Sequence, residues 1–172
     1  MKNKKGFTLI ELLATISILA LIMAVAVPNV MNIIDKNKKA TYVEDAKKMI
    51  TLAEYKIRSD TSIALPEADH CVVILLRALD QSDLQKGPEG GSYDLDLSYV
   101  MITNKDNQYI YYASLVENYQ SRTRGLTLLS RDDLLDEKAI TKVKANDDLQ
   151  TVEPTKYELL NGYYVDDVIF ES

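Results

Sequence analysis

The sequence of 172 residues has little of the chemistry on which catalytic and metal sites depend. It contains one cysteine, Cys71, so no disulfide can form within the chain. His70 is the only histidine, and residues 60–172 show no paired metal-ligand spacing, no phosphate-binding glycine loop and no nucleophile motif. These shortages favour a protein that is not an enzyme and needs no cofactor or metal.

The two rare residues are neighbours, but their positions argue against a shared site. Adjacent residues of an extended strand point to opposite faces, so His70 and Cys71 would not converge on a metal or form a nucleophile pair. Cys71 begins an apolar run and is expected to be a small buried core residue. Acidic pairs elsewhere are expected to be solvated charge, with a cation site left open, and these pairs are Asp132-Asp133, Asp147-Asp148 and Asp166-Asp167.

Net positive charge is also missing. The formal net charge is −6, and loss of the three lysines within residues 1–6 would leave 17 basic against 26 acidic side chains, a net of −9. A domain this acidic is a poor general binder of nucleic acid or anionic lipid headgroups. The small cluster of Arg122, Arg124 and Arg131 could touch DNA or an acidic neighbour, but the overall charge favours an ordinary surface cluster.

The chain does have a long apolar run near its N-terminus. The 28 residues 7–34 include a single charged side chain, Glu11. At 1.5 Å rise per residue this run forms a helix about 42 Å long, which exceeds the ~30 Å hydrocarbon core of a bilayer. We therefore expect a single-pass membrane segment, and the basic residues 2–5 favour a cytoplasmic N-terminus. A carboxylate within a membrane helix is costly, so Glu11 is expected to have a functional partner there.

The residues around Glu11 carry a family resemblance. Residues 6–12, Gly-Phe-Thr-Leu-Ile-Glu-Leu, follow three lysines and precede an apolar helix that contains Pro28. This motif, within about the first 30 residues, resembles the start of a type IV prepilin, the family of pilins and pseudopilins. The resemblance implies cleavage between Gly6 and Phe7 by a prepilin peptidase on the cytoplasmic face, usually with N-methylation of Phe7.

The resemblance also implies a role for Glu11, which would pair with the free N-terminal amine of a neighbouring subunit. A free α-amine has a reference pKa of about 7.7–8.0 and is largely cationic at neutral pH. In hydrocarbon this pair costs far less than either charge alone. The implied partners are other pilin subunits in a homo- or heteropolymer, the prepilin peptidase and a pilus assembly platform in the plasma membrane. The implied destination is an extracellular pilus that serves adhesion, twitching motility or DNA uptake.

Other interpretations of the N-terminus stay open. The lysines, the apolar run and the small residues 24–26 could form an ordinary secretory signal, although Glu11 and the continuation of the run to Ile34 oppose this. Within the family, a pseudopilin of a type II secretion or competence system shares the motif with pilus subunits. A membrane-tethered binding or enzymatic domain that never polymerises is a third alternative. The missing disulfide and the turn at residues 87–91 resemble Gram-positive, clostridial-type pilins.

A helical pattern continues beyond the apolar run. Apolar side chains recur every three or four residues from Tyr42 to Ile57, with charged residues between them. We predict one helix from about Thr8 to about Ser59. Pro28 either kinks this helix or is tolerated in it without a kink. The predicted parts are a leader, residues 1–6; a transmembrane and assembly half, 7–34; an amphipathic half, 35–59; and a globular head, 60–172.

The head is predicted to be α+β, a type IV pilin fold in which the long helix packs on a small antiparallel sheet. Strands are expected at residues 98–103, 109–116 and 125–129, in a meander of three to five strands with one face exposed to water. Asn161-Gly162 predicts a type I′ hairpin, and Ser130 with Asp133 predicts a capped short helix. The apolar residues 71–79 fit either a buried helix or a strand that runs into a helical turn.

Overall fold

The computed structural model describes residues 7–82 and 84–170. The predicted leader, with Gly6, lies outside the described residues. One helix, α1 (Leu9–Ser59), confirms the predicted continuous helix. Contacts within the chain divide it into two units, with the boundary between Asn37 and Lys38. The finer divisions after residues 34 and 59 stay predictions.

The first unit consists of the apolar half of α1. Its large apolar side chains are exposed along the whole segment, from Phe7 at 82% to Ile34 at 48%. By length and composition this helix can cross a membrane, and none of the residues that the structure describes buries its most apolar window. The segment therefore presents an apolar surface that only lipid or other protein chains can cover.

Three polar side chains of this apolar half form hydrogen bonds within the helix itself. Thr15, Ser17 and Asn29 each donate a hydrogen bond to a carbonyl of the preceding turn, at 2.8, 2.8 and 3.1 Å. Such bonds remove the cost of placing a hydroxyl or amide in hydrocarbon. The helix runs unbroken through Pro28, and the predicted kink there stays a prediction.

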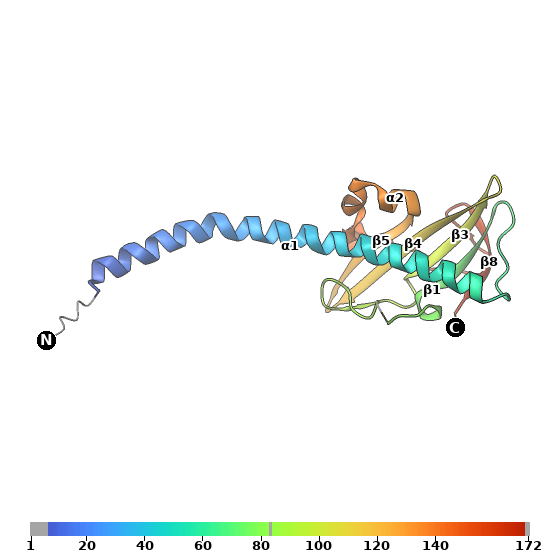
Figure 1. Cartoon of the computed structure of the whole chain (residues 1–172), viewed down its shortest axis with the longest axis horizontal. Helices are drawn as coiled ribbons and strands as arrows, with labels where there is room; N and C mark the ends of the chain where they lie inside the picture. The colour runs from blue at the N-terminus through green and yellow to red at the C-terminus, as the bar shows by residue number, and fades with distance from the viewer. Residues whose placement is uncertain (1–6, 83, 171–172) are drawn as a thin grey trace. The chain divides into compact units, whose positions relative to one another are not determined.

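In the second unit, the C-terminal half of α1 lies along one face of a sheet (Figure 1). The predicted apolar stripe is confirmed from Tyr42 to Ala53, where its side chains are at most 5% exposed, and Ile57 is partly buried against the same cluster. The fully charged side of the helix faces away from this contact. The buried stripe consists of Tyr42, Val43, Ala46, Met49, Ile50 and Ala53.

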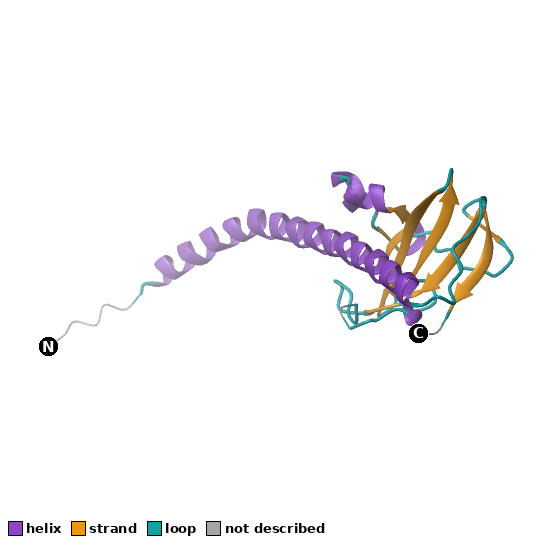
Figure 2. Cartoon of the chain, turned by 45° about the vertical axis from the view of Figure 1, so that its right-hand side comes forward, coloured by secondary structure: helices purple, strands orange, loops and turns teal. Residues whose placement is uncertain are grey.

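Among the described residues, eight strands form one sheet in the order β6-β5-β4-β3-β1-β8-β7, with β2 paired to β4. Figure 2 shows the strands of this sheet in orange. The strands are β1 (His70–Leu75), β2 (Ser92–Tyr93), β3 (Tyr99–Lys105), β4 (Gln108–Tyr119), β5 (Arg122–Ser130), β6 (Lys144–Ala145), β7 (Leu159–Leu160) and β8 (Tyr163–Ile169). Short helices follow β1, β5 and β6, namely η1 (Leu76–Ala78), α2 (Arg131–Leu135), η2 (Glu137–Lys142) and η3 (Asn146–Asp148). The α+β layout and the predicted strands of the meander are confirmed.

The predicted sheet is wrong in two respects: among the described residues it has eight strands rather than three to five, and it is mixed rather than antiparallel. β8 pairs in parallel with β1, from His70 opposite Tyr164 to Ile74 opposite Ile169. The chain reaches this position after a long connection and adds β8 to the edge of β1 that β3 leaves open. The Asn161-Gly162 hairpin predicts a strand after the turn but not its second neighbour, because either edge of a sheet can accept it.

Two local predictions in the head are confirmed, and one is wrong. β1 runs directly into η1, so the apolar run is a strand followed by a helical turn. Asn161 and Gly162 have φ of 52° and 87°, as a type I′ turn requires. The second face of the sheet is not wet, because a separate apolar cluster centred on Val73, Met101 and Val168 covers it.

The predicted cap of α2 is confirmed and supports a prediction of modest size. Ser130 Oγ accepts from the Asp133 backbone N–H at 3.1 Å, and the Asp133 carboxylate accepts from Ser130 N and Oγ. We expect Ser130→Ala to lower the free energy of unfolding by about 1 kcal/mol, because the first turn loses its side-chain acceptor. Urea unfolding, monitored by tyrosine fluorescence, measures this loss. Ser130→Thr keeps the hydroxyl, so its free energy of unfolding should stay close to that of wild type.

Candidate functional site

The predicted assembly residue, Glu11, lies in the first turn of α1 and folds back on the start of the helix. Its Oε2 accepts from both the backbone N–H and the hydroxyl of Thr8, each at 2.8 Å. In return, the Thr8 hydroxyl accepts from the Glu11 backbone N–H at 3.3 Å. This reciprocal capping box satisfies donors at the helix start and places a carboxylate at the positive end of the helix dipole.

The capping box directs the Glu11 carboxylate toward the point at which a processed chain would begin. Phe7 directly precedes Thr8, and its side chain is 82% exposed. Thr8 is not among the residues predicted from the sequence, although the spacing Thr-x-x-Glu from Thr8 to Glu11 is a recognised capping signal. Gly6 lies outside the described residues, so the cleavage site itself stays a prediction.

A second concentration of polar groups lies inside the head, between α1, β4 and the turn at residues 87–91. The Glu117 side chain is 1% exposed. Its carboxylate accepts from the Tyr42 hydroxyl at 2.5 Å, from Gly91 N–H at 2.7 Å and from Glu89 N–H at 3.1 Å. A buried carboxylate with three donors fixes the turn against the helix, since each donor would otherwise be unsatisfied.

Beside Glu117, a second buried carboxylate joins the helix to β2. Asp45 is 5% exposed and accepts from the Tyr93 hydroxyl at 2.7 Å and from Lys48 Nζ at 2.9 Å. The rings of Tyr42 and Tyr93 meet edge to face, with centroids 6.3 Å apart. Burial and the hydrogen bond to Asp45 raise the pKa of Tyr93, so its hydroxyl stays protonated and donates.

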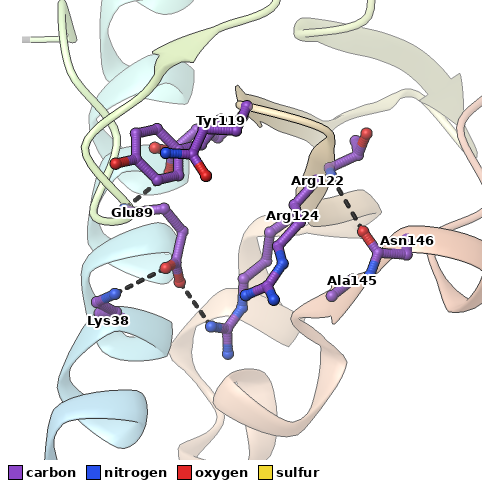
Figure 3. Close-up of a pocket in the computed structure, with 10 residues that line it drawn as sticks. Lys38, Glu89, Tyr119, Arg122, Arg124, Ala145 and Asn146 are labelled. Carbon is purple, nitrogen blue, oxygen red and sulfur yellow. Dashed lines mark hydrogen bonds and ion pairs between the residues drawn. The ribbon is translucent and has the colours of Figure 1, made fainter.

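Charged side chains next to these buried groups line an open groove of about 550 Å³ (Figure 3). Glu89, on the turn, accepts from Lys38 Nζ of α1 at 2.7 Å and from Arg124 of β5 at 2.6 Å. Arg122, two residues before Arg124 on the same strand, lines the groove as well. The groove thus places three basic side chains beside two carboxylates, Glu89 and Glu117, in an otherwise acidic chain.

The Glu89 ion pairs predict a dependence of stability on pH. Burial opposes ionisation, but the hydrogen bonds from Lys38 and Arg124 outweigh it and lower the pKa of Glu89 below its ordinary 4.5. Because the folded state has the lower pKa, the stabilisation is fully present above about pH 4.5 and is lost as pH falls through the folded value.

The test compares wild type with Glu89→Gln in urea unfolding of the full chain in detergent at pH 7 and at pH 3. We expect the variant to be less stable at pH 7 and nearly equal to wild type at pH 3. If wild type and Glu89→Gln differed in free energy of unfolding by the same amount at both pH values, the ionised Glu89 would not be the source of the pH dependence.

The remaining sequence candidates do not assemble into one site. His70 Nδ1 lies 2.5 Å from Asp166 Oδ1, while the Cys71 side chain is fully buried on the other face of β1. Burial, aided by the charge of Asp166, raises the pKa of the Cys71 thiol to about 12. Arg131 pairs with Glu54 at 2.9 Å and does not line the groove of Arg122 and Arg124. Among the residues that the structure describes, no three His, Cys, Asp or Glu side chains could hold a metal ion.

Comparison with known proteins identifies only the N-terminal segment. Residues 1–27 match the prokaryotic N-terminal methylation motif. This motif indicates a type IV pilin-like or pseudopilin precursor, and it implies processing by a prepilin peptidase and assembly with other pilin subunits. The apolar helix that carries it suggests membrane insertion. No curated protein and no solved structure matches the chain.

Proposed function

We propose that the chain is a structural subunit of a type IV pilus. It is made as a membrane-inserted precursor, cleaved after Gly6, methylated at Phe7 and polymerised through the apolar half of α1. The head, together with the rest of the second unit from Lys38, then forms the outer surface of an extracellular filament used in adhesion, motility or DNA uptake. The chemistry at Gly6 and Phe7 is done to this chain by other enzymes, and the chain itself is structural rather than catalytic.

One observation carries this proposal, the methylation motif at the start of a helix whose apolar half has no cover within the chain. A membrane anchor alone needs apolar side chains but no carboxylate, whereas Glu11 has a clear use if a neighbouring amine neutralises it. The same apolar surface that lipid covers in the precursor is available to pack against other copies in a filament. The membrane-inserted precursor and the assembled filament would therefore both use the apolar half of α1.

Electron microscopy of material sheared from the cell surface tests the proposal. Antibodies against the head should label filaments that are long compared with the cell envelope, and a strain that lacks the chain should show no label. Label confined to short envelope-bound structures would contradict the pilus and favour a pseudopilin. Label on the cell surface without any filament would instead favour a tethered domain.

A further inference from the structure

The groove beside Arg122 is lined by three basic side chains, and the ion pairs within the chain do not engage all of them. The Glu89 carboxylate forms ion pairs with Lys38 and Arg124. Within the part of the chain that the structure describes, the Arg122 guanidinium has no hydrogen bond or ion pair, and its residue is exposed. An arginine presents five donors in a planar fork that suits a carboxylate, so this side chain can donate hydrogen bonds to an acidic group.

The strand geometry directs the two arginines into the same recess. Arg122 and Arg124 are two residues apart on β5, opposite Tyr119 and Glu117 of β4, and side chains at this spacing share one face of a sheet. In Figure 3 both arginine side chains point in the same direction. Glu89 already shows that a carboxylate fits between Arg124 and Lys38 in this groove.

We propose that this groove binds carboxylates of a second copy of the chain and so joins neighbouring heads in the filament. The inference rests on the proposed function and adds a specific contact to it. The expected ligands are Asp or Glu side chains on the head of the neighbouring subunit, held by Arg122 at the open end of the groove.

Charge explains why the occupant should be another copy. Without the lysines of residues 1–6, the chain has a net side-chain charge of −9 from 17 basic and 26 acidic residues. Heads with this charge repel one another when a filament brings them together. The Arg122 guanidinium, which Glu89 does not engage, offers the neighbour's carboxylates an opposite charge and turns part of that repulsion into attraction.

The position of the groove in the sequence favours the same occupant. Lys38 follows the apolar run, residues 7–34, after only three residues of the same helix. If the apolar runs of adjacent subunits pack together, the beginning of each head comes next to the neighbouring copies. A carboxylate of a neighbouring copy can therefore reach Arg122, which lines the same groove as Lys38.

Zero-length carbodiimide coupling on Arg122→Lys filaments tests the contact directly. The reagent joins a lysine amine to a carboxylate only where the two touch, and the substitution supplies an amine at the proposed contact. Mass spectrometry of the covalent dimer should find residue 122 joined to an Asp or Glu of another copy. The Lys38–Glu89 pair, 2.7 Å apart within one chain, provides the internal positive control. If that control product forms and no dimer contains residue 122, the inference is wrong.

A charge reversal supplies the second arm. We expect Arg122→Glu to reduce filaments per cell by roughly tenfold relative to wild type, since the reversal replaces attraction by repulsion at every subunit contact. Lys105→Glu is the matched control, because Lys105 is an exposed cation at the end of β3 and away from the groove. Equal amounts of precursor in the membrane and equal melting of the detergent-solubilised chains show that the variants fold.

The outcomes separate this inference from the proposed function. Abundant wild-type filaments together with normal Arg122→Glu filaments would overturn the groove contact and leave the pilus assignment standing. Absence of the wild-type chain from every filament would overturn both. If free anions rather than a second copy occupied the groove, phosphate or acetate would protect residue 122 from coupling, and the dimer would be missing.

Discussion

Glu11→Val is expected to abolish incorporation of the chain into surface filaments, with a loss of roughly tenfold or more in filament-bound subunit. The valine removes the only charge of residues 7–34, so membrane insertion of the precursor should remain intact or improve. What is lost is the carboxylate that Thr8 holds at the start of α1, where the amine of a neighbouring subunit would need it. An unpaired amine in hydrocarbon disfavours docking.

The matched control for this experiment is Thr15→Val. Thr15 is another polar residue of the apolar half, but its hydroxyl donates only to the Leu12 carbonyl of its own helix at 2.8 Å. Its removal should leave filaments at wild-type levels. Immunoblots of membrane and sheared fractions measure both variants. Filaments of Glu11→Val at wild-type abundance would show that the carboxylate does not act in assembly.

Glu117→Ala is expected to destabilise the head by about 3–4 kcal/mol and to lower its melting temperature by roughly 10 °C. The alanine removes a buried acceptor and leaves the Tyr42 hydroxyl and the N–H groups of Glu89 and Gly91 without partners. The turn at residues 87–91 then loses its attachment to α1. Near-ultraviolet circular dichroism follows this unfolding, because nine of the eleven tyrosines lie from Tyr93 onward.

Tyr42→Phe separates the role of the whole carboxylate from that of one bond. It removes the 2.5 Å hydrogen bond but leaves Glu117 with two N–H donors, so we expect a loss of about 1 kcal/mol. The order of stability should therefore be wild type, Tyr42→Phe, then Glu117→Ala. Equal melting of Glu117→Ala and wild type would mean that the buried carboxylate makes no net contribution to the fold.

Much of the fold follows from local patterns in the sequence. The period of the apolar residues in α1 predicts both its length and the stripe that packs on the sheet, because a helix brings every third and fourth residue to one face. The turn at Asn161-Gly162 and the cap at Ser130 were equally readable, since each depends on residues that are close in sequence. Local chemistry decides these features, and tertiary context leaves them unchanged.

The features that sequence alone did not predict depend on contacts between distant residues. Glu117 lies in a strand where a polar residue would ordinarily face water, and its partner Tyr42 is 75 residues away. The ion pairs of Glu89 span 51 residues to Lys38 and 35 to Arg124. The parallel pairing of β8 with β1 also depends on which strands meet in the fold, and the residue pattern of a strand does not specify this. The motif at the N-terminus was visible, but the groove that we propose to join the heads required the fold.

Mass spectrometry of purified filaments tests the central claim most directly, because one measurement reports both processing and incorporation. The account predicts that the chain is present as a filament component and that its N-terminal peptide begins at N-methylated Phe7. A chain in the filament fraction that begins at Met1 or Val27, or complete absence of the chain from filaments, would contradict the account.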